Sequence, residues 1–112
     1  MDDIQGWINK LINCGKLIVV EGIKDKAALE EFGIKHIVVL KKPLFQVTEE
    51  INDKEVVLLT DLDKEGKKLY GKLKKDLNKR GIKVDTVFRE WLFKNTKLRQ
   101  IEGLPTYFRN SH

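Results

Sequence analysis

Carboxylates follow two short apolar runs of the sequence, at positions where they could act together. Glu21 comes directly after the run at residues 17–20, and Asp61 and Asp63 follow the run at residues 56–60. If the two runs form neighbouring parallel strands, about 4.8 Å apart, Glu21 and Asp61 project from the same edge of the sheet. Carboxylates gathered at one edge repel one another unless a cation joins them, and such hard oxygen ligands suit Mg²⁺ or Mn²⁺. These three residues are therefore predicted to form a metal site for phosphodiester chemistry.

Two acids beside these residues have both a functional and a structural interpretation, and two glycines support the predicted site. Asp25 is a candidate catalytic residue, and it is also suited to cap a helix that begins there. Glu65 either contributes to the site or only complements the dipole at the start of its helix. Gly22 permits a sharp turn beside Glu21, and Gly66 opens a helix whose N-terminal amides favour an anion.

Positive charge is concentrated in one stretch of the chain. There are 22 basic and 17 acidic side chains, a net charge of +5, and residues 64–80 hold eight basic and only two acidic ones. A basic excess favours a polyanionic partner. The candidate contacts to a nucleic-acid backbone are Lys41, Lys42, Lys67, Lys68 and Arg89. The alternative is that the helical lysines form only the solvated face of an amphipathic helix.

The apolar pattern alternates between strand and helix. Short apolar runs, largely β-branched, predict four buried strands, at residues 17–20, 36–40, 56–60 and 84–88. Helices are expected before residue 15 and at residues 25–32, 45–51 and 65–80, then a helical or irregular stretch at 89–102 and a tail at 103–112. Glycines 15, 33 and 81 each end a helix just before a strand.

This alternation predicts an α/β fold of the Rossmann-like type. We expect a four-stranded parallel sheet in the order 2-1-3-4, with helices on both faces. In such sheets ligands bind beyond the carboxyl ends of the strands, at the switch point between strands one and three. Glu21 and Asp61 follow those two strands.

Length and composition narrow the class of protein. The 112 residues suffice for one domain, and 41% hydrophobic residues suffice for one core. The longest apolar runs have four residues, whereas a membrane helix needs about 20. A single cysteine, Cys14, excludes an internal disulfide and a Cys-rich zinc site. Because the N-terminus has no secretory leader, a cytoplasmic protein without membrane association is expected.

Two segments resemble the motifs of a known domain. Residues 17–25 read Leu-Ile-Val-Val-Glu-Gly-Ile-Lys-Asp and resemble the first motif of the Toprim domain, Glu-Gly-x-x-Asp after a strand. Residues 57–66 resemble its second motif, Asp-x-Asp followed by Gly. The whole chain is similar to the small stand-alone archaeal Toprim proteins. The resemblance implies a helix at 1–15, a Toprim domain at 16–88 and a C-terminal extension at 89–112.

The resemblance also implies roles for the acids. Glu21 would be the general acid/base or a metal ligand, Asp61 and Asp63 would hold Mg²⁺, and Asp25 would support them. Lys67 stands where type IA topoisomerases have a further acid, so the topoisomerase-type acidic set is incomplete. The chain also has no room for the separate domain that carries a topoisomerase's nucleophilic tyrosine.

The leading hypothesis is Mg²⁺-dependent phosphodiester chemistry on RNA or DNA, by a nuclease that is a monomer or a weak homo-oligomer. A second hypothesis is a non-catalytic module that binds nucleic acid or a protein through the same face. A third, from another class, is a phosphoacceptor receiver domain with Asp61 as acceptor. The receiver domain requires paired acids after the first strand and a fifth strand, and the sequence shows neither.

Overall fold

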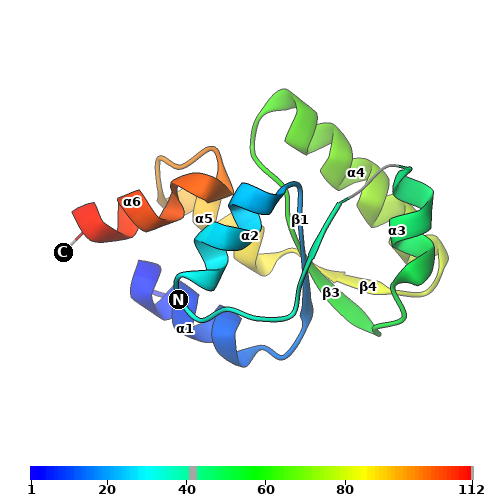
Figure 1. The fold of residues 1–112 in the computed structure, drawn as a ribbon, viewed down its shortest axis with the longest axis horizontal. Coiled ribbons are helices and arrows are strands. Elements are labelled where there is room, and N and C mark those ends of the chain that lie inside the picture. The colour runs from blue at the N-terminus through cyan, green and yellow to red at the C-terminus, as the bar shows by residue number, and fades with distance from the viewer. Residues whose placement is uncertain (41–42, 112) are drawn as a thin grey trace.

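The computed structural model describes residues 1–40 and 43–111, which form a parallel sheet between two layers of helices (Figure 1). Its four strands lie in the order β2-β1-β3-β4 and all pair in parallel. They are β1 Leu17–Val20, β2 Ile37–Val39, β3 Glu55–Leu59 and β4 Lys83–Asp85. The fold class and the strand order expected from the alternating pattern are confirmed.

Helices connect the strands and cover both faces of the sheet. They are α1 Ile4–Asn13, α2 Ile23–Glu30, α3 Leu44–Glu50, α4 Lys64–Lys79, α5 Val87–Asn95 and α6 Leu104–Asn110, with a short 3₁₀ helix, η1, at Ile101–Gly103. Figure 1 shows α3 and α4 on one side of the sheet and α1, α2, α5 and α6 on the other. In the described chain, no helix has both the length and the hydropathy needed to cross a bilayer.

The strands divide the apolar core in two because successive side chains point to opposite faces. Val57 and Leu59 of β3 pack with α1, α2, α5 and α6, whereas Val56 and Leu58 pack with α3 and α4. All four of these side chains are fully buried. A strand with both faces buried needs a continuous apolar sequence, which explains why the runs lack the alternation of a half-exposed sheet.

The prediction that three glycines end helices just before strands is confirmed. Gly15, Gly33 and Gly81 have φ values of 69°, 79° and 79°, in the left-handed region that glycine adopts without strain. Each lets the chain leave a helix and turn back into the sheet.

Two expected elements are wrong. The fourth strand ends at Asp85, not at residue 88, because the Asp85 carboxylate accepts a hydrogen bond from the Val87 amide (3.0 Å) and α5 begins there. Residues 104–110 form a docked helix, not a tail. Leu104 is buried in α6, and the ring of Phe108 meets that of Phe32 edge-on at 5.2 Å.

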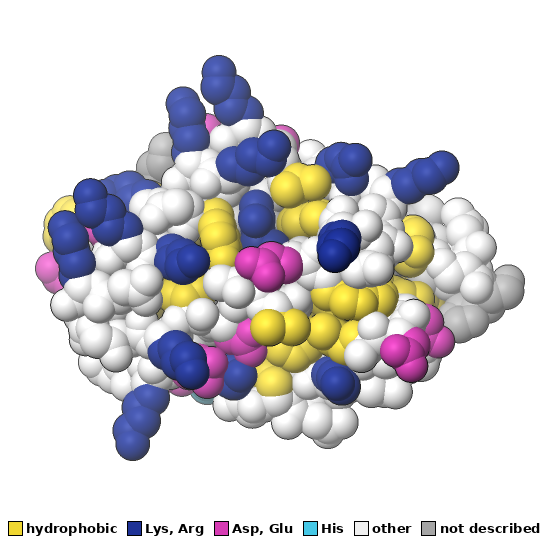
Figure 2. All heavy atoms as spheres, turned by 180° about the vertical axis from the view of Figure 1, so that it is seen from behind, with side chains coloured by type: hydrophobic (Ala, Val, Ile, Leu, Met, Phe, Trp, Pro, Cys, Tyr) yellow, Lys and Arg dark blue, Asp and Glu magenta, His cyan; other side chains and the backbone are white. Residues whose placement is uncertain are grey.

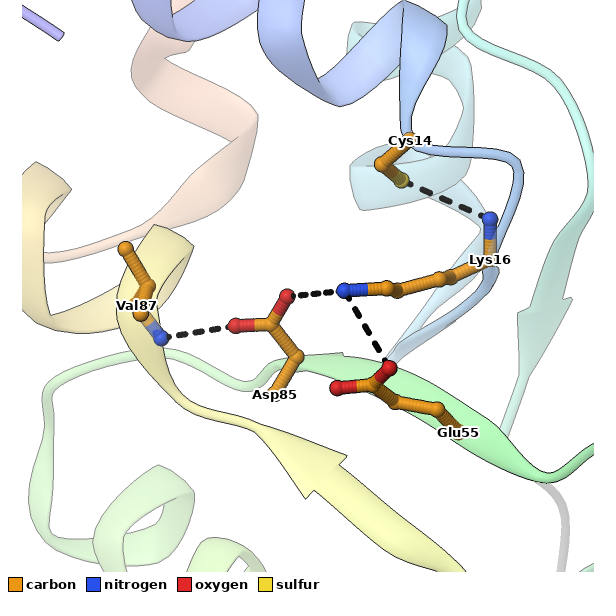
Figure 3. Close-up of polar contacts among 5 residues, drawn as sticks. All are labelled: Cys14, Lys16, Glu55, Asp85 and Val87. Carbon is orange, nitrogen blue, oxygen red and sulfur yellow. Dashed lines mark hydrogen bonds and ion pairs between the residues drawn. The ribbon is translucent and has the colours of Figure 1, made fainter.

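An ion-pair network fastens the amino ends of the central strands. Lys16 Nζ lies 2.7 Å from the carboxylate of Asp85 and 3.4 Å from that of Glu55 (Figure 3). The hydrogen bond to Asp85 raises the pKa of Lys16, against a lowering by burial. This network ties the segment before β1 to β3 and β4, at the end of the strands away from Glu21 and Asp61.

Candidate functional site

The register of the sheet brings two of the predicted acids into contact. Val20, the last residue of β1, lies opposite Leu59, the last residue of β3. Glu21 therefore comes beside the chain that leaves β3, and its Oε2 accepts a hydrogen bond from the Asp61 amide (2.5 Å). Two segments 40 residues apart meet here, at the switch point where the chain leaves β1 for β2 and β3 for β4.

Asp63 and Gly66 position the start of α4 beside the contact between Glu21 and Asp61. Asp63 is the N-cap of α4, and its Oδ1 accepts a hydrogen bond from the Gly66 amide (2.8 Å). A Cβ on Gly66 would lie 2.1 Å from the carbonyl oxygen of Asp61 and 2.9 Å from Oε2 of Glu21. No other residue type leaves room for this approach, so Gly66 is required by the packing of α4 on both acids.

Asp25 caps α2 from inside the helix. Gly22 is the N-cap, and the Asp25 carboxylate reaches back to accept a hydrogen bond from its amide (3.0 Å). The sequence-based expectation that Asp25 is itself the N-cap is therefore wrong by three positions. Its side chain is only 6% exposed, at the base of the turn that carries Glu21.

The C-terminal segment closes over the site, which sequence reasoning missed. Asp61 Oδ1 accepts a hydrogen bond from the Ile101 amide (2.8 Å), and the Leu62 amide donates to the Arg99 carbonyl (2.8 Å). These contacts use backbone groups, which every residue type carries, so no sequence signal marks them. They fix one oxygen of Asp61 and the path of the loop after β3.

Arg89 lies beneath the acids. Its side chain is 8% exposed, and it donates to the carbonyls of Thr60 (2.9 Å) and Asp61 (2.8 Å). The guanidinium lies 4.4 Å from the ring centroid of Tyr70 and 5.3 Å from that of Phe93. In the sequence Arg89 is a candidate phosphate contact, but its burial and its partners indicate that it holds the loop that carries Asp61.

The carboxyl groups share one electrostatic environment. Burial raises the pKa of Glu21, and the charges of Asp61, Asp63 and Asp25 raise it further, against a lowering by the hydrogen bond from Asp61. Burial also raises the pKa of Asp61, with Asp63 and Glu102 adding to the rise and the Ile101 amide opposing it. For Asp25, burial and then Asp61 raise the pKa to about 6. A bound cation would favour the charged forms of all these groups.

Comparison with known proteins assigns this arrangement to a family. Residues 15–88 match the Toprim domain. The chain belongs to the Toprim family. This membership confirms the resemblance of its two motifs and indicates a nucleic-acid-related, metal-dependent function.

Several relatives of this Toprim chain are of similar size. A UPF0292 protein of Methanocaldococcus jannaschii is 36% identical over 99 residues, which are 82% of this chain and 77% of that one. A UPF0292 protein of Pyrococcus abyssi is 38% identical over 100 residues, 87% of this chain and 75% of that one. The solved structure of a putative protein from Aquifex aeolicus superposes with a TM-score of 0.84 at 34% identity, covering 91% of this chain and 98% of that chain.

The donor set of the Toprim site suits a hard divalent cation. Each acid uses one oxygen for a backbone amide. Within residues 1–40 and 43–111, the other oxygens, Glu21 Oε1, Asp61 Oδ2 and Asp63 Oδ2, have no protein donor. No three such side chains in that part of the chain are close enough to form a ready-made metal cage. Mg²⁺ does not need one, because it usually binds one or two carboxylates and keeps several waters.

The remaining predicted residues lie around this centre. Lys67, Lys68 and Glu65 are exposed in the first turns of α4. Figure 2 shows basic side chains gathered over the part of the opposite face where α4 lies. Lys41 and Lys42 lie outside the described residues.

Proposed function

We propose that this Toprim protein cleaves phosphodiester bonds of nucleic acid with Mg²⁺ or Mn²⁺, as a nuclease. The single observation that supports this best is the contact between Glu21 and the Asp61 backbone, with Asp63 at the adjoining start of α4. It brings the Glu21 carboxylate to the loop that carries Asp61 and Asp63, at the edge of a parallel α/β sheet where ligands usually bind.

In this proposal each acid has a separate task. Asp61 and Asp63 would hold the metal, and Glu21 would be either a further ligand or the group that moves the proton. When bound, the ion polarises the phosphodiester and neutralises charge that develops on its oxygens. Asp25 and Arg89 keep the turn after β1 and the loop after β3 in place. Lys67 and Lys68, with Lys41 and Lys42, bind the nucleic-acid backbone.

A second candidate function is a binding module without turnover. It is favoured by the absence of a ready-made metal cage in the described residues and by the use of Asp63 as a helix cap. Such a module binds nucleic acid in a salt-sensitive manner and cleaves nothing. Membership of the Toprim family speaks against the third hypothesis, a receiver domain.

The test is a cleavage assay with end-labelled RNA and DNA in Mg²⁺ and in Mn²⁺. Glu21→Gln and Asp61→Asn should each lower the cleavage rate by about a hundredfold or more, because each removes a negative charge from the metal site. Glu49→Gln, an exposed acid on α3, is the matched control and should cleave like the wild type. Wild-type protein that binds but never cleaves would leave the binding module as the function. Cleavage that survives in Glu21→Gln would contradict the proposed mechanism.

We further propose a cytoplasmic protein that is a monomer or a weak homo-oligomer. Gel filtration with light scattering over a range of concentrations tests the oligomeric state.

A further inference from the structure

An open groove runs from the acids along α2 and β2. One end contains Glu21 and Asp61, one wall carries Ile23 and Ala27 of α2, and the other carries Ile37 and Val39 of the edge strand. Its volume is about 1060 Å³, just above the roughly 300–1,000 Å³ typical of small-molecule sites. The groove is therefore continuous with the proposed metal site and has room beyond it.

The walls of the groove are apolar although it is open to water. Ile23 is 79% exposed, directly after the turn that follows Glu21. Ala27 lies one helical turn later, so it shares a face of α2 with Ile23. A phosphate and a metal ion need none of this apolar surface. It suits a flat ring with apolar faces that is linked to a phosphate through a sugar, which describes a nucleobase of a nucleic acid.

A duplex presents phosphates on its outside and delivers such a group only at the cost of unstacking and unpairing a base. A single strand can turn a base outward and place it against protein side chains. We propose that the groove between α2 and β2 receives an unpaired base of the substrate, which makes single-stranded nucleic acid the preferred substrate class. This inference rests on the proposed function for the identity of the ligand.

Two lysines stand at the same groove. Lys24 and Lys26 both line it, and neither forms an ion pair with a described residue. Their charges are therefore available to phosphates on either side of the base. They also offset part of the negative charge of the five acidic residues that line the groove, Glu21, Asp25, Glu30, Asp61 and Glu102.

The test is a binding titration that does not depend on cleavage. The probe is a fluorescently labelled strand of about eight nucleotides, as RNA and as DNA, alone and annealed to its complement. Ca²⁺ replaces Mg²⁺ so that the strand stays intact.

The single strand should bind at least about tenfold more tightly than the duplex. Ile23→Ala should weaken single-strand binding by roughly five- to tenfold and leave duplex binding unchanged. Val87→Ala, which alters an exposed apolar residue on α5, is the matched control and should change neither.

Amide chemical shifts locate the bound strand directly, since the chain is small enough for such spectra. Addition of the single strand should shift the amides of residues 22–27 and 37–40. Tighter duplex binding, equal weakening of both forms by Ile23→Ala, or no binding of either form would each overturn the proposal; the last result would leave the groove to a peptide partner. If the protein cleaves duplex in a metal-dependent manner and Ile23→Ala does not change the rate, the proposal of base binding in the groove is wrong but the proposed nuclease function stands. If a base binds in the groove but nothing is cleaved, the proposed nuclease function is wrong and the proposal of base binding stands.

Discussion

Asp25 shows how a buried carboxyl makes this protein sensitive to pH. Its pKa rises from an ordinary 3.8 to about 6, first because of burial and then because of Asp61. The folded state therefore holds the proton more tightly than the unfolded state. The stability that this provides is fully present below pH 3.8 and is lost as the pH rises through about 6.

We predict that Asp25→Asn flattens this pH dependence. In metal-free buffer, the melting temperature of the wild type should fall between about pH 4.5 and 7, and the fall should be smaller in the variant. At pH 7 the variant should melt no lower than the wild type, because a neutral amide avoids a desolvation cost on the order of 2 kcal/mol. The exposed Glu49→Gln variant should keep the wild-type slope. A variant with that same slope would show that Asp25 does not carry the effect.

Among single residues, the acids of the site could be predicted from the sequence, but the groups that hold them in place could not. Glu21 and Asp61 could be placed together because each directly follows an apolar strand. The amide of Ile101, which fixes Asp61, could not be found, because a backbone donor leaves no trace in residue types. Arg89 looked like any other cation of the basic half, and only its burial between Tyr70 and Phe93 separates it from the exposed lysines.

Helix α4 has two glycines whose surroundings differ. Gly66 faces the Asp61 carbonyl at the start of the helix, whereas nothing lies within 4 Å of a Cβ on Gly71. Gly66→Ala should therefore lower the free energy of unfolding by about 2–4 kcal/mol and abolish metal binding, because α4 must move away from both acids. Gly71→Ala should raise it by about 0.5–1 kcal/mol, since alanine is the better helix former.

Urea denaturation of both variants, followed by circular dichroism, checks this pair. Equal effects of the two substitutions would mean that the close approach of Gly66 is not what places α4.

The element boundaries that could be predicted are those with a local chemical cause. Gly15, Gly33 and Gly81 end their helices through their own backbone freedom, so their roles follow from the sequence. The end of β4 depends on a side chain of the strand bonding the next helix, and α6 depends on a docking partner, Phe32, more than 70 residues earlier in the chain. Those two boundaries were mispredicted because nonlocal or competing contacts decide them.

One apolar cluster joins the three proposed parts of the chain, which are a helix at 1–15, a Toprim domain at 16–88 and an extension at 89–112. Trp7 of α1 and Leu104 of α6 lie in the same apolar cluster as Val20 and Leu59 of the sheet. Trp7 also donates to the Phe88 carbonyl (2.8 Å). The alternation of strands and helices was enough to predict the sheet order, because right-handed crossovers leave few alternatives. The alternation did not predict that the N-terminal and C-terminal helices pack on the same face of the sheet.

The charge of the whole molecule is uneven, and binding should reflect that. If Lys67 and Lys68 each contact a phosphate, the variant with both changed to Gln should lower the slope of log affinity against log salt by about 1–2. The matched control changes Lys10 and Lys54, which are also exposed but lie on α1 and before β3. It should keep the wild-type slope. Fluorescence anisotropy with a labelled single strand between 50 and 300 mM salt measures both, and equal slopes in the two variants would rule out a specific role for α4.

The central claim is that Glu21, Asp61 and Asp63 together bind a divalent ion. Mn²⁺ tests it most directly, because this paramagnetic ion broadens the amide resonances of nearby residues. Titration of the labelled protein with substoichiometric Mn²⁺ should broaden residues 20–25 and 60–66 first, and Asp61→Asn should remove that pattern. Excess Mg²⁺ should restore the lost signals in the wild type. Broadening centred on any other part of the chain, or a pattern unchanged in Asp61→Asn, would contradict the account.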